Sequence, residues 1–228
     1  MIKSGSFSCA GKQHGLLSER NEDVVLERDC GTHRVIVLCD GAGSCANGKA
    51  AAWLTADTLA EFLSVRFARF LLENAEVLRL EVVNLITEVL TDAAQKAGAD
   101  PGSFGCTVMA AAMDQQGRWC LFHLGDGTAV GKLYPGSDWL VFSYPQRGLL
   151  PGATTLTMNG SMFDNLRFYR HDYPSDRSLF LMSDGAMELL RRVPRLLEKM
   201  ELGLALPEPE NMSEDDCSAA WLIARQKS

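Results

Sequence analysis

The chain has 228 residues, of which 46% are hydrophobic and 22% are charged, and its formal net charge is −7. This length and hydrophobic content predict one large globular domain, residues 1–228, with an ordinary buried core. The negative charge argues against binding to nucleic acid or to a membrane surface, because both partners attract an excess of lysine and arginine.

The lack of a recognisable targeting signal and the usage of cysteine both predict a cytoplasmic protein. No apolar run reaches the roughly 18 residues that would cross a bilayer, and the first residues lack the apolar stretch of a signal peptide. The seven cysteines are odd in number, lie mostly inside apolar segments and form no closely spaced pair of the zinc-binding type. We interpret them as reduced thiols in or near the core, as expected in a cytosol.

The first part of the chain predicts strands followed by two helices. The strand candidates are residues 6–9, 24–28 and 34–39. The last of these is a strong β-branched run that ends at Asp40. Apolar positions at helical spacing then predict helices over about 47–72 and 77–97, the first beginning at a favourable capping residue, Asn47. We expect the two helices to form a helical hairpin.

The remainder of the chain is mostly strand. Further strands are predicted at residues 106–113, 118–124, 128–134, 139–143, 166–171, 178–182 and 217–224. Residues 146–160 are rich in Gly, Pro and Thr and predict a surface loop or flap. A helix is expected over 186–200, which Pro194 should kink or divide. Strands at both ends with a helical hairpin inserted between them predict a layered α+β domain.

Acidic residues recur where apolar runs begin or end. The clusters are Glu22-Asp23, Asp40-Gly41, Asp184-Gly185 and Asp215-Asp216. Each borders a strand-like segment, so one fold would bring them all to one edge of a sheet, where facing carboxylates demand cations. Hard divalent cations prefer such oxygen ligands. Any single Asp-Gly pair is weak evidence, since it is mostly a turn signal.

Six short motifs in chain order resemble those of the metal-dependent protein phosphatases, the type 2C serine/threonine phosphatases. They are Arg20-Asn21-Glu22-Asp23, Asp40-Gly41-Ala42-Gly43, Gly105-Cys106-Thr107, Gly125-Asp126-Gly127, Ser183-Asp184-Gly185 and Asp215-Asp216-Cys217-Ser218. The resemblance covers nearly the whole chain, which is similar to the compact bacterial members. It implies a four-layer α-β-β-α sandwich, in which two antiparallel sheets are covered by helices and two Mn²⁺ or Mg²⁺ ions lie at one end.

The resemblance also implies which residues hold the ions. They are Glu22, Asp23, Asp40, Gly41, Asp184 and Asp215. In such a site Asp40 would bridge the two ions, and Asp184 and Asp215 would complete the catalytic acidic support. Two ions so placed activate a water molecule for attack on a phosphoryl group, so no protein nucleophile is required.

A weaker third metal position, seen in some members, has two candidate ligands here, Asp126 and Glu188. Each has a plainer explanation. Asp126 stands in a Gly-Asp-Gly turn, and Glu188 lies in a first helical turn, where the helix dipole favours an acid. Thr107 follows Gly105 within a strand and is interpreted as structural.

The chain departs from the family pattern at three positions. Ser18 stands where many members carry an arginine that clamps the substrate phosphate, so Arg20 and His14 become the candidate phosphate-binding residues. Ala42 replaces a histidine proposed as the general acid in eukaryotic members, and many bacterial members also lack it. Asp216 replaces a commoner asparagine, which adds a negative charge.

These observations favour a Mn²⁺- or Mg²⁺-dependent phosphatase that hydrolyses phosphoserine or phosphothreonine in a phosphorylated protein. The resemblance further implies a serine/threonine kinase that opposes it. Two alternatives stay open. The missing arginine and histidine are also compatible with a non-catalytic family member that acts as a regulatory or phosphopeptide-binding module. The same carboxylates would serve a two-metal hydrolase of a small phosphate ester.

Overall fold

The computed structural model describes residues 1–12, 21–146, 154–193, 195–204 and 214–225. Its strands are β1 (Ile2–Cys9), β2 (Asp23–Asp29), β3 (His33–Asp40), β4 (Val108–Asp114), β5 (Trp119–Leu124), β6 (Thr128–Lys132), β7 (Leu140–Ser143), β8 (Arg167–His171), β9 (Arg177–Met182) and β10 (Cys217–Ala224). Its helices are α1 (Gly48–Phe70), α2 (Ala75–Ala97), α3 (Met162–Asn165), α4 (Asp184–Arg192) and α5 (Leu196–Leu202), with a short 3-10 helix, η3, at Pro101–Ser103. Each strand and helix expected above is present.

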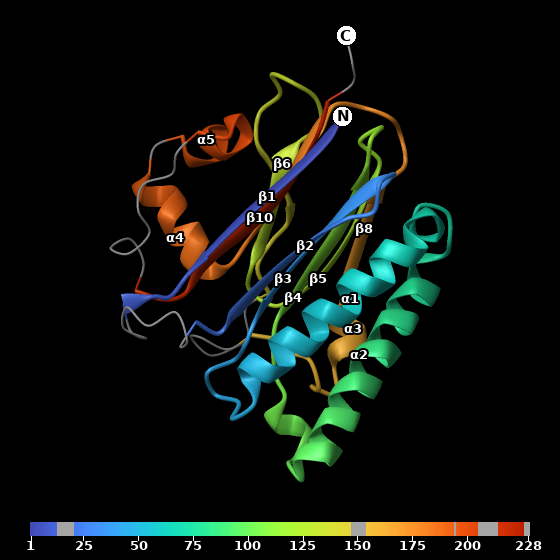
Figure 1. Ribbon diagram of the computed structural model, residues 1–228, viewed down its shortest axis with the longest axis vertical. Coiled ribbons are helices and arrows are strands. Elements are labelled where there is room, and N and C mark those ends of the chain that lie inside the picture. The colour runs from blue at the N-terminus through green and yellow to red at the C-terminus, as the bar shows by residue number, and fades with distance from the viewer. Residues whose placement is uncertain (13–20, 147–153, 194, 205–213, 226–228) are drawn as a thin grey trace.

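The strands form two five-stranded sheets, ordered β1-β10-β9-β6-β7 and β2-β3-β4-β5-β8, in which all neighbouring strands are antiparallel. In Figure 1, α1 and α2 cover the outer side of the second sheet, and α4 and α5 lie beside the first sheet at the opposite side of the molecule. The architecture is therefore the expected four-layer α-β-β-α sandwich.

The sequence of strand β3 is an unbroken apolar run because both faces of the strand are buried. Successive side chains of a strand point to opposite faces of the sheet. Val35 and Val37 face α1 and α2, whereas Ile36 and Leu38 face the other sheet, and all four side chains are fully buried. A strand that is covered on both faces has no solvent side, so it lacks the alternation of a surface strand.

The first sheet is covered on both faces in the same way. In β9, Leu179 and Leu181 belong to the core between the two sheets, and Phe180 belongs to the core under α4 and α5. Leu189 and Met200 bring the two short helices onto that outer face. Three apolar layers thus hold the four structural layers together.

Two helix starts, those of α1 and α4, differ from expectation. Asn47 precedes α1, but its side chain makes no capping hydrogen bond and instead donates to the Ser103 hydroxyl at 2.8 Å. The helix expected over 186–200 is divided into α4 and α5, as the proline suggested. It begins earlier, at Asp184, because the Ser183 hydroxyl accepts a hydrogen bond from the backbone N–H of Ala186.

Within the described residues, no helix combines the length and the apolar character needed to span a bilayer.

The strand ends that carry the acidic residues meet at one end of the sandwich. Asp23 begins β2 and Asp40 ends β3, and the two are paired in register. Asp184 follows β9 and Asp215 precedes β10, and these two strands are also direct neighbours.

Candidate metal centre

A cavity of about 600 Å³ opens at this end of the sandwich. Its described lining includes six acidic residues and no lysine, arginine or histidine. The lining residues are Glu22, Asp40, Gly41, Ala42, Gly43, Ser44, Thr107, Asp126, Thr154, Leu156, Asp184, Asp215 and Asp216. Acidic side chains from segments far apart in the sequence therefore surround one hollow.

Asp23, the cross-strand partner of Asp40, does not line the cavity and is 7% exposed. Neither of its carboxylate oxygens has a hydrogen-bond partner among the described residues. Burial, with repulsion from Asp216 and Asp184, raises the pKa of Asp23 to about 8. Ser218 opposes this rise of the pKa in part. Its hydroxyl also donates to the Ser8 hydroxyl at 2.7 Å. A buried carboxylate in this position fits a site that receives positive charge from outside the chain.

Asp40 faces the cavity from the end of β3. Its backbone N–H donates to the Thr107 hydroxyl at 3.1 Å, and its carbonyl accepts from the Thr107 N–H at 2.8 Å. Burial and then repulsion from Asp23, Asp184 and Asp126 raise the pKa of Asp40 well above its ordinary value. Thr107 therefore fixes the backbone of Asp40, whose carboxyl is repelled by several neighbouring acids.

Gly41 continues β3 as an isolated antiparallel bridge with Cys106 and passes close to the start of α1. Its N–H donates to the Glu22 carbonyl at 3.1 Å, which ties the two acidic segments together. A Cβ atom at this position would lie 2.6 Å from the Gly48 carbonyl carbon and 2.7 Å from the Lys49 nitrogen, which is closer than atoms can approach. Only glycine lets the acidic turn pack against the start of α1.

Asp184 is the first residue of α4, and one of its carboxylate oxygens accepts from the Gly185 N–H at 2.7 Å. Burial and then repulsion from Asp126 and Asp215 raise its pKa to about 6. The Ser183 N–H donates to the Ser218 carbonyl at 2.9 Å, and the Ser218 N–H donates to the Ser183 hydroxyl at 3.0 Å. These bonds hold Asp184 and Asp215 at adjacent strand ends.

Asp216 has a positioning role that the sequence did not reveal. One carboxylate oxygen accepts from the Gly11 N–H at 2.8 Å, and the other accepts from the Glu22 N–H at 2.7 Å. Gly11 approaches so closely that a Cβ atom there would lie 2.2 Å from the Asp215 carbonyl carbon. Asp216 thus joins the segments that carry Glu22 and Asp215.

The donor chemistry of the centre fits Mg²⁺ or Mn²⁺. Both ions take carboxylate and carbonyl oxygens, and the charge of a divalent cation would lower the raised pKa values of Asp23, Asp40 and Asp184. No three Asp, Glu, His or Cys side chains of the described residues form a ready-made ligand set. Ion binding therefore requires the carboxylates to rotate on a backbone that already places them around one cavity.

The structure places most of the predicted ligands together. Glu22, Asp40, Gly41, Asp126, Asp184 and Asp215 all line the cavity, and Asp23 is buried opposite Asp40 on the neighbouring strand. Glu188 does not line this cavity, but it lines an adjoining hollow together with Asp126 and Asp184, and its carboxylate pairs with Arg192. The predicted phosphate-binding residues His14 and Arg20 lie outside the described part of the chain.

Sequence reasoning missed part of the wall. Ser44 lines the cavity. It follows Asp40 in a Gly-rich segment, and this position in the sequence could have identified it as a wall residue. Thr154 and Leu156 come from the loop interpreted as a flap. Nothing in their local sequence distinguishes them from other loop residues.

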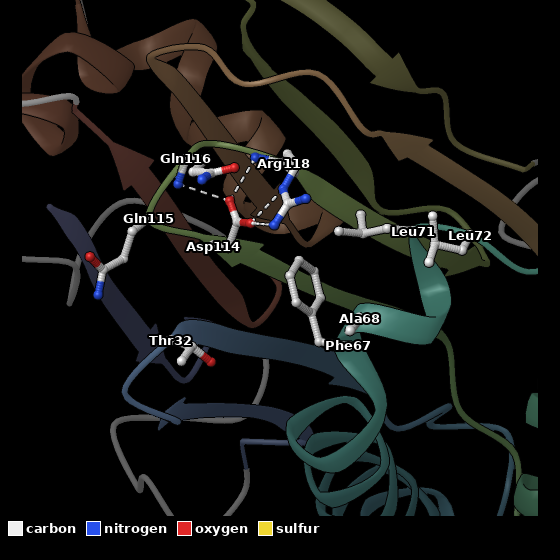
Figure 2. Close-up of a pocket in the computed structure, with 9 residues that line it drawn as sticks. All are labelled: Thr32, Phe67, Ala68, Leu71, Leu72, Asp114, Gln115, Gln116 and Arg118. Atoms are coloured by element: carbon white, nitrogen blue, oxygen red, sulfur yellow. Dashed lines mark hydrogen bonds and ion pairs between the residues drawn. The ribbon is translucent and has the colours of Figure 1, made fainter.

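A separate hollow of about 470 Å³ lies between the C-terminal end of α1 and the β4–β5 turn (Figure 2). Its single carboxylate, Asp114, already accepts hydrogen bonds from the backbone N–H groups of Gln116 and Arg118 and from the Arg118 guanidinium. The helix contributes apolar side chains, such as Phe67 and Leu71. This hollow lacks the converging acids of the first cavity.

Comparison with known proteins agrees with this geometry. The chain superposes on a bacterial serine phosphatase with a TM-score of 0.67 and 18% identity, covering 100% of both chains. It superposes on PppA, a regulatory component of the T6SS in Pseudomonas aeruginosa, with a TM-score of 0.65 and 20% identity over 98% of both chains. RsbX in complex with magnesium matches with a TM-score of 0.61 and 11% identity, over 97% of this chain and 94% of that one.

At these identities the structures show a shared fold, and no curated protein matches the sequence. The sequence profile of the family described as Protein phosphatase 2C, however, matches residues 10–217. That span contains every acidic residue of the cavity. The chain belongs to the protein phosphatase 2C family.

Proposed function

We propose that this protein is a Mn²⁺- or Mg²⁺-dependent phosphatase that removes phosphate from phosphoserine or phosphothreonine in a phosphorylated protein. The observation that carries the proposal is the meeting of Asp40, Asp184 and Asp215 in one cavity, with the pKa values of Asp40 and Asp184 raised. Such perturbed carboxylates in a cleft are typical of functional sites.

Asp40, Asp184 and Asp215 would hold two divalent cations together with the Gly41 carbonyl and Glu22. When bound, these cations would activate water and neutralise charge on the phosphoryl group. Asp126 lines this cavity and would be available to a third cation, and Glu188 lines the adjoining hollow that Asp126 also borders.

The chain's own contribution is to fix the positions of these acids. Thr107 holds the backbone of Asp40, and Asp216 holds the backbone N–H of Glu22. Because these side chains anchor the backbone N–H groups of Asp40 and Glu22, the two acids stay at the cavity even while they repel their neighbours. His14 and Arg20 remain the predicted phosphate-binding residues.

The relatives support the finer parts of the proposal. RsbX was crystallised with magnesium, which favours a divalent cation here. PppA is described as a regulatory component, which favours a signalling role. An opposing serine/threonine kinase and a cytoplasmic setting complete the proposed context.

The test is phosphate release from a phosphothreonine peptide with Mn²⁺, with Mg²⁺ and with EDTA. We expect release only with a metal, and loss of release in Asp40→Asn and in Asp184→Asn. The exposed Asp138→Asn variant is the matched control and should retain release. Metal binding without turnover would contradict catalysis and favour a regulatory module. A preference for nucleotide or sugar phosphates over every phosphopeptide would favour a small-ester hydrolase.

A further inference from the structure

A second hollow of about 280 Å³ adjoins the candidate metal centre. The two share Asp126 and Asp184 in their walls, so they adjoin. The second hollow lies between α4 and the segment that follows β7, and we call it the side groove. Its apolar surface comes from Val141, Tyr144, Pro145 and Met187.

The apolar side chains of the side groove are open to contact. Tyr144 is 66% exposed and Val141 is 38% exposed, although both lie beside a strongly acidic cavity. A cavity of about 150 Å³ can hold a benzene molecule. The side groove is larger than that, so it has room for one large aliphatic side chain and part of the backbone that carries it.

The wall that carries Tyr144 is held in place before any ligand binds. The Tyr144 carbonyl accepts from the Arg167 guanidinium at 2.5 Å. The next turn is closed by a reciprocal pair, in which the Gln146 N–H donates to the Gly125 carbonyl at 2.8 Å and the Gly125 N–H donates to the Gln146 side chain at 2.7 Å. A preformed wall loses little conformational entropy when a ligand binds.

Positive charge is available at the rim of the side groove. Arg191, in the last turn of α4, is exposed and forms no ion pair with any described residue. Its neighbour Arg192 instead pairs with Glu188. The groove also contains Glu188, whose carboxylate is paired with Arg192, and the two acids that it shares with the cavity. Arg191 is the cation at its rim that forms no ion pair with the described residues.

Resting on the proposed function, we propose that the side groove binds the substrate segment next to the phosphorylated residue. It selects a large apolar side chain within three residues of that position, followed by an acidic residue that faces Arg191. The phosphorylated side chain in the cavity and its neighbour in the groove would then span both hollows, since they share Asp126 and Asp184. A small phosphate ester would leave the groove unused.

The experiment is a scan of phosphothreonine peptides in which a single leucine replaces serine at each of the three positions on either side. With the wild type, kcat/KM should be about tenfold higher for leucine than for serine at one position, the discrimination typical of one apolar side chain in a pocket. Tyr144→Ala and Val141→Asp should each reduce this ratio to about twofold or less. Tyr134→Ala removes a tyrosine that is 60% exposed and lies outside the groove, and it should keep the ratio.

Arg191 has a separate readout. In peptides that carry the favoured leucine, aspartate beyond it should raise kcat/KM in the wild type and lower it in Arg191→Glu. Unchanged behaviour in Arg191→Glu would overturn the assignment of the cation.

Measurements of peptide binding distinguish a failure of the side groove from a failure of the proposed function. The dissociation constants of the same labelled peptides are measured by fluorescence anisotropy on Asp40→Asn, with and without Val141→Asp. Leucine-selective binding that Val141→Asp abolishes would support the side groove even if no peptide is hydrolysed, in which case only the proposed function fails. Turnover or binding that shows no preference for leucine would contradict binding of the substrate in the side groove. A leucine preference that persists in both Tyr144→Ala and Val141→Asp would contradict it as well. So would a failure of every peptide to bind.

Discussion

Asp23 and Asp40 are cross-strand partners at the point where β2 begins and β3 ends. Like charges placed directly opposite each other in a sheet destabilise it. Here Asp23 is also buried without a hydrogen-bond partner among the described residues, and it contributes to the raised pKa of Asp40. When both acids are ionised, the hairpin therefore carries a repulsion that a bound cation would relieve.

Asp40→Asn should separate stability from activity. Removal of the Asp40 charge relieves its repulsion with Asp23, Asp184 and Asp126, so above pH 8, where these acids ionise, the metal-free variant should unfold at a higher urea concentration than the wild type. Phosphate release should fall on the order of 10³-fold, because several kcal/mol of metal-dependent stabilisation is lost. Urea unfolding in EDTA and phosphate release in Mn²⁺ check the two parts. A variant less stable than the wild type in EDTA above pH 8 would contradict this repulsion.

The stability of the metal-free protein should fall as pH rises. The pKa values of Asp23, about 8, and of Asp184, about 6, lie above the ordinary value of 3.8. The folded state thus binds these protons more tightly than the unfolded state. Their contribution to stability is greatest below about pH 4 and is lost as pH rises through 6 and 8. Mn²⁺ should therefore raise the melting temperature more at pH 8 than at pH 5.

Asp23→Asn isolates this effect from other titrating groups. In EDTA, the variant should lose less stability between pH 6 and pH 8 than the wild type loses. Thermal unfolding at several pH values measures the difference. Parallel curves for the two proteins would rule out Asp23 as a source of the pH dependence.

Asp216→Ala should destabilise the protein by about 2 kcal/mol, because the N–H groups of Gly11 and Glu22 lose a charged acceptor. Asp216→Asn keeps one oxygen acceptor and should cost roughly half as much. Urea unfolding measures both. An Asp216→Ala variant as stable as the wild type would mean that these bonds contribute nothing to holding Glu22.

Gly41→Ala should cost roughly 1–3 kcal/mol, because its Cβ atom would collide with the backbone at Gly48 and Lys49. It should also reduce phosphate release, since Asp40 is the preceding residue. Gly160→Ala is the matched control, because a Cβ atom there meets nothing within 4 Å. Its stability should stay within about 0.5 kcal/mol of the wild type. Equal effects at the two glycines would contradict the close approach at Gly41.

Much of the fold and the acidic centre could be predicted from local sequence. The β-branched run before Asp40 and the apolar run before Asp184 mark strand ends, because a strand buried on both faces must end where charge begins. The resemblance then placed these acids at one end of a sandwich, and six of the predicted ligands do line one cavity.

The rest depends on tertiary contacts that no local pattern carries. Trp53 lies at helical spacing with buried residues, yet it is 54% exposed, because the neighbours of a helix decide which apolar residues are covered. Asp216 accepts from Gly11, a residue almost the whole chain away. The walls of the side groove, such as Tyr144 and Met187, likewise come from separate segments.

The most direct test of the account is anomalous diffraction from crystals of the protein soaked in Mn²⁺. We expect two manganese peaks among Asp40, Asp184 and Asp215, one of them within bonding distance of the Gly41 carbonyl. A well-ordered, Mn²⁺-soaked structure with no manganese in this cavity, and with these three carboxylates turned away from one another, would contradict it.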